Sequence, residues 1–200
     1  WSRCAMARVG ISPAICIADR EVFLSQLLLD IAPDRQPSLD NFVAGRNLEL
    51  LSALRHALSG GSSERCFYVW GEAGSGKSHL LQACVRAAQD VQTNQNMQHS
   101  AIYAQGSVPP RSMDMGAAVV AVDDVEALDD AAQIALFDLY NQMRDNGGML
   151  LVSGKGSPLH LGLRDDLRTR LGWGLVYQLH GLSEEEKAQA LMRHAHALGF

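Results

Sequence analysis

The segment GEAGSGKS, residues 71–78, constrains the fold of this 200-residue chain more than any other part of its sequence. It satisfies the pattern G-x-x-x-x-G-K-[ST] through Gly71, Gly76, Lys77 and Ser78. A short aromatic and β-branched run, CFYVW at 66–70, precedes it and is typical of a buried strand. The run SHLLQACVRAAQ follows with a helical pattern. Because this strand–loop–helix order is the context that the motif requires, the segment predicts an α/β fold with a phosphate-binding loop.

The chemistry of the loop suits the phosphates of a nucleotide. Glycines let successive backbone N–H groups turn toward a phosphate, and the start of the following helix adds partial positive charge. We expect Lys77 at the β- and γ-phosphates of ADP or ATP, and Ser78 as a ligand of Mg²⁺. His79 is expected to pack beside the phosphates. The remaining residues predicted to contact the nucleotide are Gly71, Glu72, Ala73, Gly74, Ser75 and Gly76.

A second element with carboxylates follows farther along the chain. The run AAVVAVDD, 117–124, is apolar until Asp123 and Asp124, as expected for an internal parallel strand. Asp123 is predicted to hold the Mg²⁺ shell, and Asp124 lies where a water-activating base is expected. The alternative is that both carboxylates belong to a solvated strand end. A predicted strand at 100–105 separates the two motifs, which indicates the ATPase branch with an extra strand between them.

Strands and helices alternate along the chain at the spacing of βαβ units. The spacing predicts a three-layer αβα sandwich with a five-stranded parallel sheet. The predicted strands are 66–70, 100–105, 117–124, 147–154 and 174–179. Besides the helix after the glycine loop, the predicted helices are 47–58, 129–146, 163–170 and 183–200, the last with a capping box from Ser183 and Glu186. On helix 129–146 the residues available to the core are Ile134, Phe137, Leu139, Tyr140 and Met143.

Composition narrows the classes of partner and compartment. The net charge is −5 and no run of Lys and Arg is present, which argues against direct binding to duplex DNA. The four cysteines form no C-x-x-C pair, which favours a reduced, cytoplasmic protein without a zinc site. The sequence predicts no membrane span. Since the first residue is Trp, we expect 1–22 to be disordered or a non-native extension. Residues 32–41, with two prolines, are predicted to be a linker to a domain over 42–200.

Several blocks of the sequence together resemble the AAA+ domain of the DnaA family of replication initiators and their regulatory inactivators. The blocks lie within residues 24–200 and are SLDNFVAGRN, GEAGSGKSHLLQA, VVAVDDVEAL, ALFDLYNQMRDNGGMLLVSG and DLRTRLGWGLVYQL. The resemblance implies that Phe42 and Val43 lie by the adenine and that Arg170 is an arginine finger. It also implies a small C-terminal helical lid with a second sensor arginine, which is missing from the sequence up to Phe200.

The segment FLSQLLLDIAP favours the inactivator branch of this family. Its residues 23–31 resemble the Q-L-x-L-x-[LI] segment with which inactivators bind the β sliding clamp of DNA polymerase III. The matching residues are Gln26, Leu27, Leu29 and Ile31. Such a peptide binds extended, with a glutamine that hydrogen-bonds and aliphatic side chains that fill an apolar pocket. The alternative is an ordinary amphipathic stretch.

The resemblance implies a function directed at a partner. The protein would dock on DNA-loaded clamp, contact DNA only through it, and present Arg170 to ATP bound on DnaA; homo-oligomer formation is left open. Lys155 stands where the family often has an Asp or Asn sensor, which implies weak or absent hydrolysis of its own nucleotide. Three alternatives remain: a fragment of DnaA itself, a helicase-loader-like AAA+ ATPase, and a scaffold that only holds nucleotide.

Overall fold

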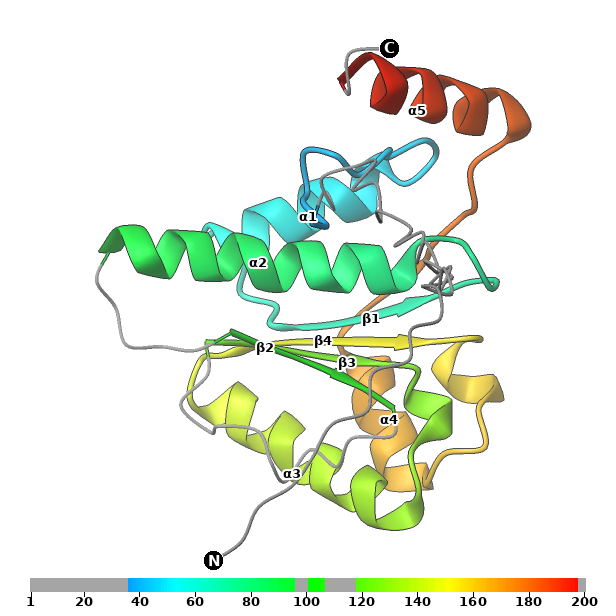
Figure 1. The fold of residues 1–200 in the computed structure, drawn as a ribbon. Helices are drawn as coiled ribbons and strands as arrows, with labels where there is room; N and C mark the ends of the chain where they lie inside the picture. Colours follow the sequence, from blue (N-terminus) through cyan, green and yellow to red (C-terminus); the bar gives the residue numbers. More distant parts are fainter. Residues whose placement is uncertain (1–35, 96–100, 107–117, 198–200) are drawn as a thin grey trace, which may run out of the picture. The chain divides into compact units, whose positions relative to one another are not determined.

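A five-stranded parallel sheet forms the centre of the computed structural model, with the strand order β2-β3-β4-β1-β5 (Figure 1). The strands are β1 (Cys66–Trp70), β2 (Ala101–Gln105), β3 (Val119–Asp123), β4 (Met149–Gly154) and β5 (Leu175–Gln178). Every pair of neighbouring strands is parallel, so their carboxyl ends lie along one edge of the sheet. The glycine loop begins at this edge, directly after β1.

The structure describes residues 36–95, 101–106 and 118–197. All of them belong to one unit of the chain, which begins at Asp34. The predicted extension 1–22 and the predicted clamp-binding residues Gln26, Leu27, Leu29 and Ile31 lie outside these ranges.

Helices cover both faces of the sheet (Figure 1). α1 (Leu48–Leu58) and α2 (Lys77–Gln95) lie on one face, and α3 (Asp130–Asp145) and α4 (Asp165–Trp173) lie on the other. The short 3-10 helices η2 (Val125–Ala127) and η3 (Pro158–His160) follow β3 and β4, and α5 (Glu184–Ala197) follows β5. The predicted three-layer αβα fold with five parallel strands is therefore confirmed.

Two apolar cores hold the layers together, one on each face of the sheet. Alternate side chains of a strand point to opposite faces, so Phe67 and Val69 join the core with α1 and α2, whereas Tyr68 joins the core with α3 and α4. All five residues of β3 and all six of β4 are buried, as internal parallel strands require. Burial of one large apolar side chain contributes about 1.5–3 kcal/mol, so these cores account for the rigidity of the strand ends.

The face that α3 turns to the sheet differs in one position from the prediction. Leu139, Tyr140 and Met143 are buried, but Ile134 is 41% exposed, so its assignment to the core is wrong. Gln133 is buried in its place: its amide nitrogen donates to the carbonyl of Leu128 and its amide oxygen accepts from the backbone of Arg164. Position 133 lies three residues before the buried Leu136 and seven before Tyr140, so it falls on the buried face of α3, where a polar side chain with both groups satisfied is accommodated.

Residues 36–41 pack onto the domain, although the sequence places them in a linker. Leu39 belongs to the core on the α1 and α2 face, and its carbonyl accepts a hydrogen bond from Arg55 at 3.0 Å. The backbone N–H of Ser38 donates to Oδ1 of Asn41 at 3.0 Å, and the N–H of Asn41 donates to Oγ of Ser38 at 3.2 Å. The folded domain therefore begins before residue 42, because a single leucine anchors an otherwise polar segment.

Helix α5 begins with the predicted capping box. The capping box is confirmed: the N–H of Ser183 donates to Oε2 of Glu186 at 2.8 Å, and the N–H of Glu186 donates to Oγ of Ser183 at 3.2 Å.

Within the described ranges, no helix combines the length and the apolar character that a bilayer crossing needs. Cys66 and Cys84 are buried free thiols, and burial raises the pKa of each to about 12.

Candidate nucleotide-binding site

The glycine loop between β1 and α2 has the backbone that its motif predicts. Gly74 and Gly76 have φ angles of 77° and 100°, a region that glycine adopts without steric cost. Gly71 has no space for a side chain, because a Cβ there would lie 2.4 Å from the carbonyl oxygen of Leu179. The three glycines are therefore required by the turn itself, and the motif marks a built loop rather than a chance match.

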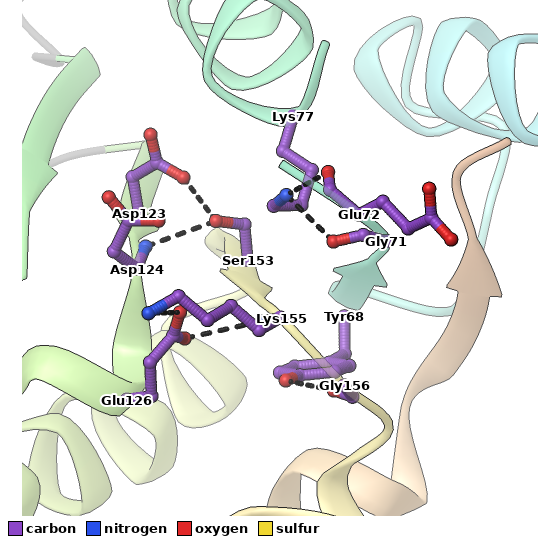
Figure 2. A network of polar contacts seen from close by, with 10 residues as sticks. All are labelled: Tyr68, Gly71, Glu72, Lys77, Asp123, Asp124, Glu126, Ser153, Lys155 and Gly156. Carbon is purple, nitrogen blue, oxygen red and sulfur yellow. Dashed lines mark hydrogen bonds and ion pairs between the residues drawn. The ribbon is translucent and has the colours of Figure 1, made fainter. Parts of the chain in front are cut away.

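The side chain of Lys77 lies across this loop. Its Nζ donates to the carbonyl oxygens of Gly71 and Glu72, at 2.9 Å each, and only 7% of the residue is exposed (Figure 2). Among the described residues, its hydrogen-bond partners are backbone carbonyls rather than a carboxylate. A buried ammonium group still lacks a countercharge in this setting, and phosphate oxygens can supply it.

The carboxylate of Asp123 is fully buried at the end of β3. The hydroxyl of Tyr103, on β2, donates to Oδ2 at 2.7 Å, and the hydroxyl of Ser153, on β4, donates to Oδ1 (Figure 2 shows Ser153). The register places Ser153 beside Asp123, since Val122 pairs with Val152. The sequence analysis missed both donors. The signal for Ser153 is a polar residue at the end of the apolar run MLLVSG, whereas no motif marks Tyr103.

Asp124 occupies a turn directly after the strand. Its φ of 55° is the single positive value among the described residues other than glycine. Its N–H donates to Oγ of Ser153 at 3.1 Å, and its side chain is partly exposed (Figure 2). A left-handed non-glycine residue costs about 1–3 kcal/mol and persists where the surroundings fix it, often at functional positions. The structure thus brings Asp123 and Asp124 together at the strand end, as predicted, with one serine contacting both.

Lys155, the residue that the sequence places at the sensor position, directs its side chain toward Glu126. Its ammonium lies 3.5 Å from Oε1 of Glu126, its backbone N–H donates to Oε2 of the same residue, and its side chain is 76% exposed (Figure 2). Ser153 is the β4 side chain that contacts Asp123. The chain beyond Lys155 is fixed separately, because the buried Tyr68 hydroxyl donates to the carbonyl of Gly156 at 2.8 Å.

The residues that are predicted to lie near the adenine are found beside the glycine loop. The rings of Phe42 and His79 have centroids 5.8 Å apart, and the edge of Phe42 lies 3.5 Å from where a Cβ on Gly76 would stand. A ring nitrogen of His79 contacts Oδ1 of Asn41 at 2.9 Å. Burial lowers the pKa of His79, opposed by a hydrogen bond with the backbone of Ser38. Val43 follows Phe42 and is partly buried.

These residues fit a magnesium-bound nucleotide. The Oγ of Ser75 is buried and has no hydrogen-bond partner within the described ranges, so a phosphate oxygen can satisfy it. Lys77 would neutralise phosphate charge, and Ser78, exposed at the start of α2, would hold Mg²⁺ together with Asp123. Two protein ligands leave the other positions of Mg²⁺ to phosphate oxygens and water, which is its usual mode of binding.

Arg170 lies on α4, apart from the loop residues. Its guanidinium carbon is 4.4 Å from the ring centre of Trp173 and 5.6 Å from that of Phe137. The neighbouring Arg168 is different, because it pairs with Asp165 at 2.7 Å. In the described part of the chain Arg170 has aromatic neighbours and no ion pair, so its charge is not neutralised by a carboxylate.

Comparison with known proteins places the chain among relatives. An uncharacterized protein of Haemophilus influenzae is 36% identical over 190 residues, which cover 88% of this chain and 77% of the relative. The chain belongs to the family of that protein. No family model matches the sequence of this family member.

Solved structures show the fold of this family member. AMPPCP-bound DnaA from Aquifex aeolicus matches with a TM-score of 0.69 and 21% identity, over 82% of this chain and 56% of that chain. Domain III of DnaA from Thermotoga maritima matches with a TM-score of 0.67 and 21% identity, over 82% and 77% of the two chains. A point variant of RuvB from Thermotoga maritima matches with a TM-score of 0.57 and 21% identity, over 84% and 55%. The chain has the AAA+ P-loop NTPase fold, and it spans little more than half the length of the longer DnaA chains.

Proposed function

We propose that this protein is an Hda-like regulatory inactivator of the replication initiator DnaA. It holds ADP or ATP with Mg²⁺ in the glycine loop, binds the DNA-loaded sliding clamp through residues 23–31, and presents Arg170 to ATP bound on DnaA. The stimulated hydrolysis converts DnaA–ATP to DnaA–ADP and prevents over-initiation in the cytoplasm. The observation that carries this proposal is the place of Arg170 relative to the glycine loop of its own chain.

Arg170 and the glycine loop lie at opposite ends of β1. Gly174, directly after α4, is packed so closely on the first residue of β1 that a Cβ would lie 2.4 Å from the carbonyl oxygen of Cys66. The loop follows the last residue, Trp70. A strand rises about 3.3 Å per residue, so β1 alone separates the two by roughly 13 Å. This separation supports an arginine that acts on a nucleotide held by another chain.

The surroundings of Arg170 suit an arginine finger. A guanidinium group is always charged and stacks on aromatic rings, and here Trp173 and Phe137 hold it without neutralising it. A finger supplied in trans stabilises charge on the transferred phosphoryl group and contributes about 10³ to 10⁵ in rate. Trp173 is 60% exposed, so the pair of side chains is accessible to a partner.

The chain's own nucleotide then acts chiefly as a structural element. Phe42 and His79 line the loop, and the segment that carries Phe42 ends at Asn47, whose amide bonds both the carbonyl and the N–H of His180 at 2.9 and 2.8 Å. A bound nucleotide would therefore stabilise the connection toward α5. Lys155 at the sensor position supports weak hydrolysis here, since an ammonium group cannot accept a hydrogen bond from water and this one pairs with Glu126. Aquifex aeolicus DnaA, with the same fold, is solved with AMPPCP bound, which supports a nucleotide in this loop.

The proposal is tested by following ATP bound to DnaA. We expect faster conversion to ADP when this protein, ADP and clamp loaded on DNA are all present, and little stimulation when any one is left out. Gln26→Ala should lose the stimulation that depends on the clamp, while the neighbouring Ser25→Ala should keep it. Stimulation that ignores the clamp contradicts the proposal. Rapid turnover of ATP by this protein alone would instead favour the helicase-loader-like ATPase.

A further inference from the structure

We propose that Tyr103 is a positioning residue for Mg²⁺: its hydroxyl orients the carboxylate of Asp123 on β3, one of the side chains that would hold the metal. The inference rests on the proposed nucleotide site and assigns it a further member. Tyr103 lies on β2, the strand next to β3, and the register pairs Tyr103 with Ala121. Its hydroxyl donates to Oδ2 of Asp123 at 2.7 Å.

The helix that carries Ser78, α2, lies over the strands that carry Tyr103 and Asp123. α2 packs on both β2 and β3, so the tyrosine stands where a helix and two strands converge. It is partly buried and packs against the core on the α2 side. The contact is thus a fixed feature of the packed domain rather than of an exposed loop.

The direction of the hydrogen bond follows from the number of protons. Tyr103 has one hydroxyl proton and gives it to Oδ2 of Asp123, which accepts it. The other carboxylate oxygen, Oδ1, accepts from Ser153. The two donors therefore hold the carboxylate in one orientation.

A neutral hydrogen-bond donor suits the carboxylate of Asp123. Asp123 is fully buried and needs hydrogen-bond donors, but a lysine or arginine would cancel the charge that attracts Mg²⁺. Tyr103 and Ser153 supply one donor each and bring no positive charge to the carboxylate. Partners that orient metal ligands in this way typically contribute about 10-fold to 100-fold to metal affinity.

The test compares nucleotide affinity with and without magnesium. Binding of a fluorescent ADP analogue is titrated in excess Mg²⁺ and in excess EDTA, and the ratio of the two Kd values gives the magnesium effect. Tyr103→Phe should reduce this ratio by about 10-fold or more and leave the Kd in EDTA unchanged. Tyr68→Phe is the matched control, because it removes the same group from β1, where the hydroxyl contacts only the carbonyl of Gly156 among the described residues. Thermal unfolding of each variant checks that it is folded.

The outcomes separate this inference from the proposed site. A parental magnesium effect that survives in Tyr103→Phe overturns the inference alone. Equal weakening in Mg²⁺ and in EDTA also overturns it, since that result indicates a structural role. A parent without any magnesium effect overturns it while leaving the nucleotide site in place. A parent that binds no nucleotide overturns the site as well.

Discussion

At the scale of single residues, Ser153 contacts both carboxylate residues at the end of β3, Asp123 and Asp124. Its oxygen accepts from the N–H of Asp124, and its one proton goes to the buried carboxylate of Asp123 (Figure 2). A buried carboxylate that loses a hydrogen-bond donor is left without that partner, which is costly in a medium of low polarity. The same serine also supports the left-handed turn at Asp124.

Ser153→Ala should therefore lower the free energy of unfolding by about 1–3 kcal/mol. Urea denaturation followed by circular dichroism measures this as a shift of the midpoint at an unchanged slope. Ser157→Ala is the control, because that hydroxyl contacts only the exposed ring of His160 among the described residues. Equal stability of the parent and Ser153→Ala would show that the contact with Asp123 has no energetic weight.

His79 makes stability depend on pH in a known direction. Burial holds its pKa below the ordinary value, so the folded protein keeps the imidazole neutral. Above about pH 6.5 the unfolded chain is also neutral there, and the site has no effect. As the pH falls below about 6.5 the unfolded state takes up the proton first, and stability is lost until the folded pKa is passed.

We expect the difference in unfolding free energy between the parent and His79→Gln to shrink as the pH falls from above about 7 to about 5. Denaturant titrations at several pH values measure it, and glutamine keeps a polar group for Asn41. Parallel curves for the two proteins would contradict burial of a neutral His79.

At the scale of elements, the sequence locates the strands well and the end of helix α4 less well. Apolar runs bounded by glycine place β1, β3 and β4 within two residues, because internal parallel strands are buried on both faces. The predicted helix 163–170 instead spans Asp165–Trp173, since its end is set by the packing of Gly174 on Cys66. That shift matters, because it puts Arg170 and Trp173 on one helix, three residues apart.

The aromatic contact on α4 gives a prediction for that element. Trp173→Ala should weaken the stimulation of DnaA by roughly 2-fold to 5-fold, since a cation–π contact at an exposed site contributes about 0.5–1 kcal/mol. Trp173→Phe should recover part of the loss. Single-turnover hydrolysis of DnaA-bound ATP measures both variants. Retention of full stimulation by Trp173→Ala would mean that Phe137 alone positions the arginine.

At the scale of the whole domain, the site contains residues that a local motif predicts and residues that only the pairing of strands brings to it. Lys77, Asp123 and Asp124 are found from local patterns, because the loop and the strand end carry their own signatures. Tyr103 and Ser153 lie on neighbouring strands, and the strand register brings them to Asp123. No local sequence pattern therefore predicts them. The place of the Lys155 side chain has the same origin, because it pairs with Glu126, from the turn after β3.

The proposed function assigns separate roles to the two ends of one strand, with the nucleotide loop after Trp70 and Arg170 near Cys66. Single-turnover hydrolysis of ATP bound to DnaA, on DNA-loaded clamp with ADP present, tests this division most directly. Arg170→Ala should lose about 10³-fold or more of the stimulation. Arg168→Ala, which removes an arginine paired with Asp165, should retain it. Full stimulation by Arg170→Ala, with clamp and ADP both present, would contradict the account.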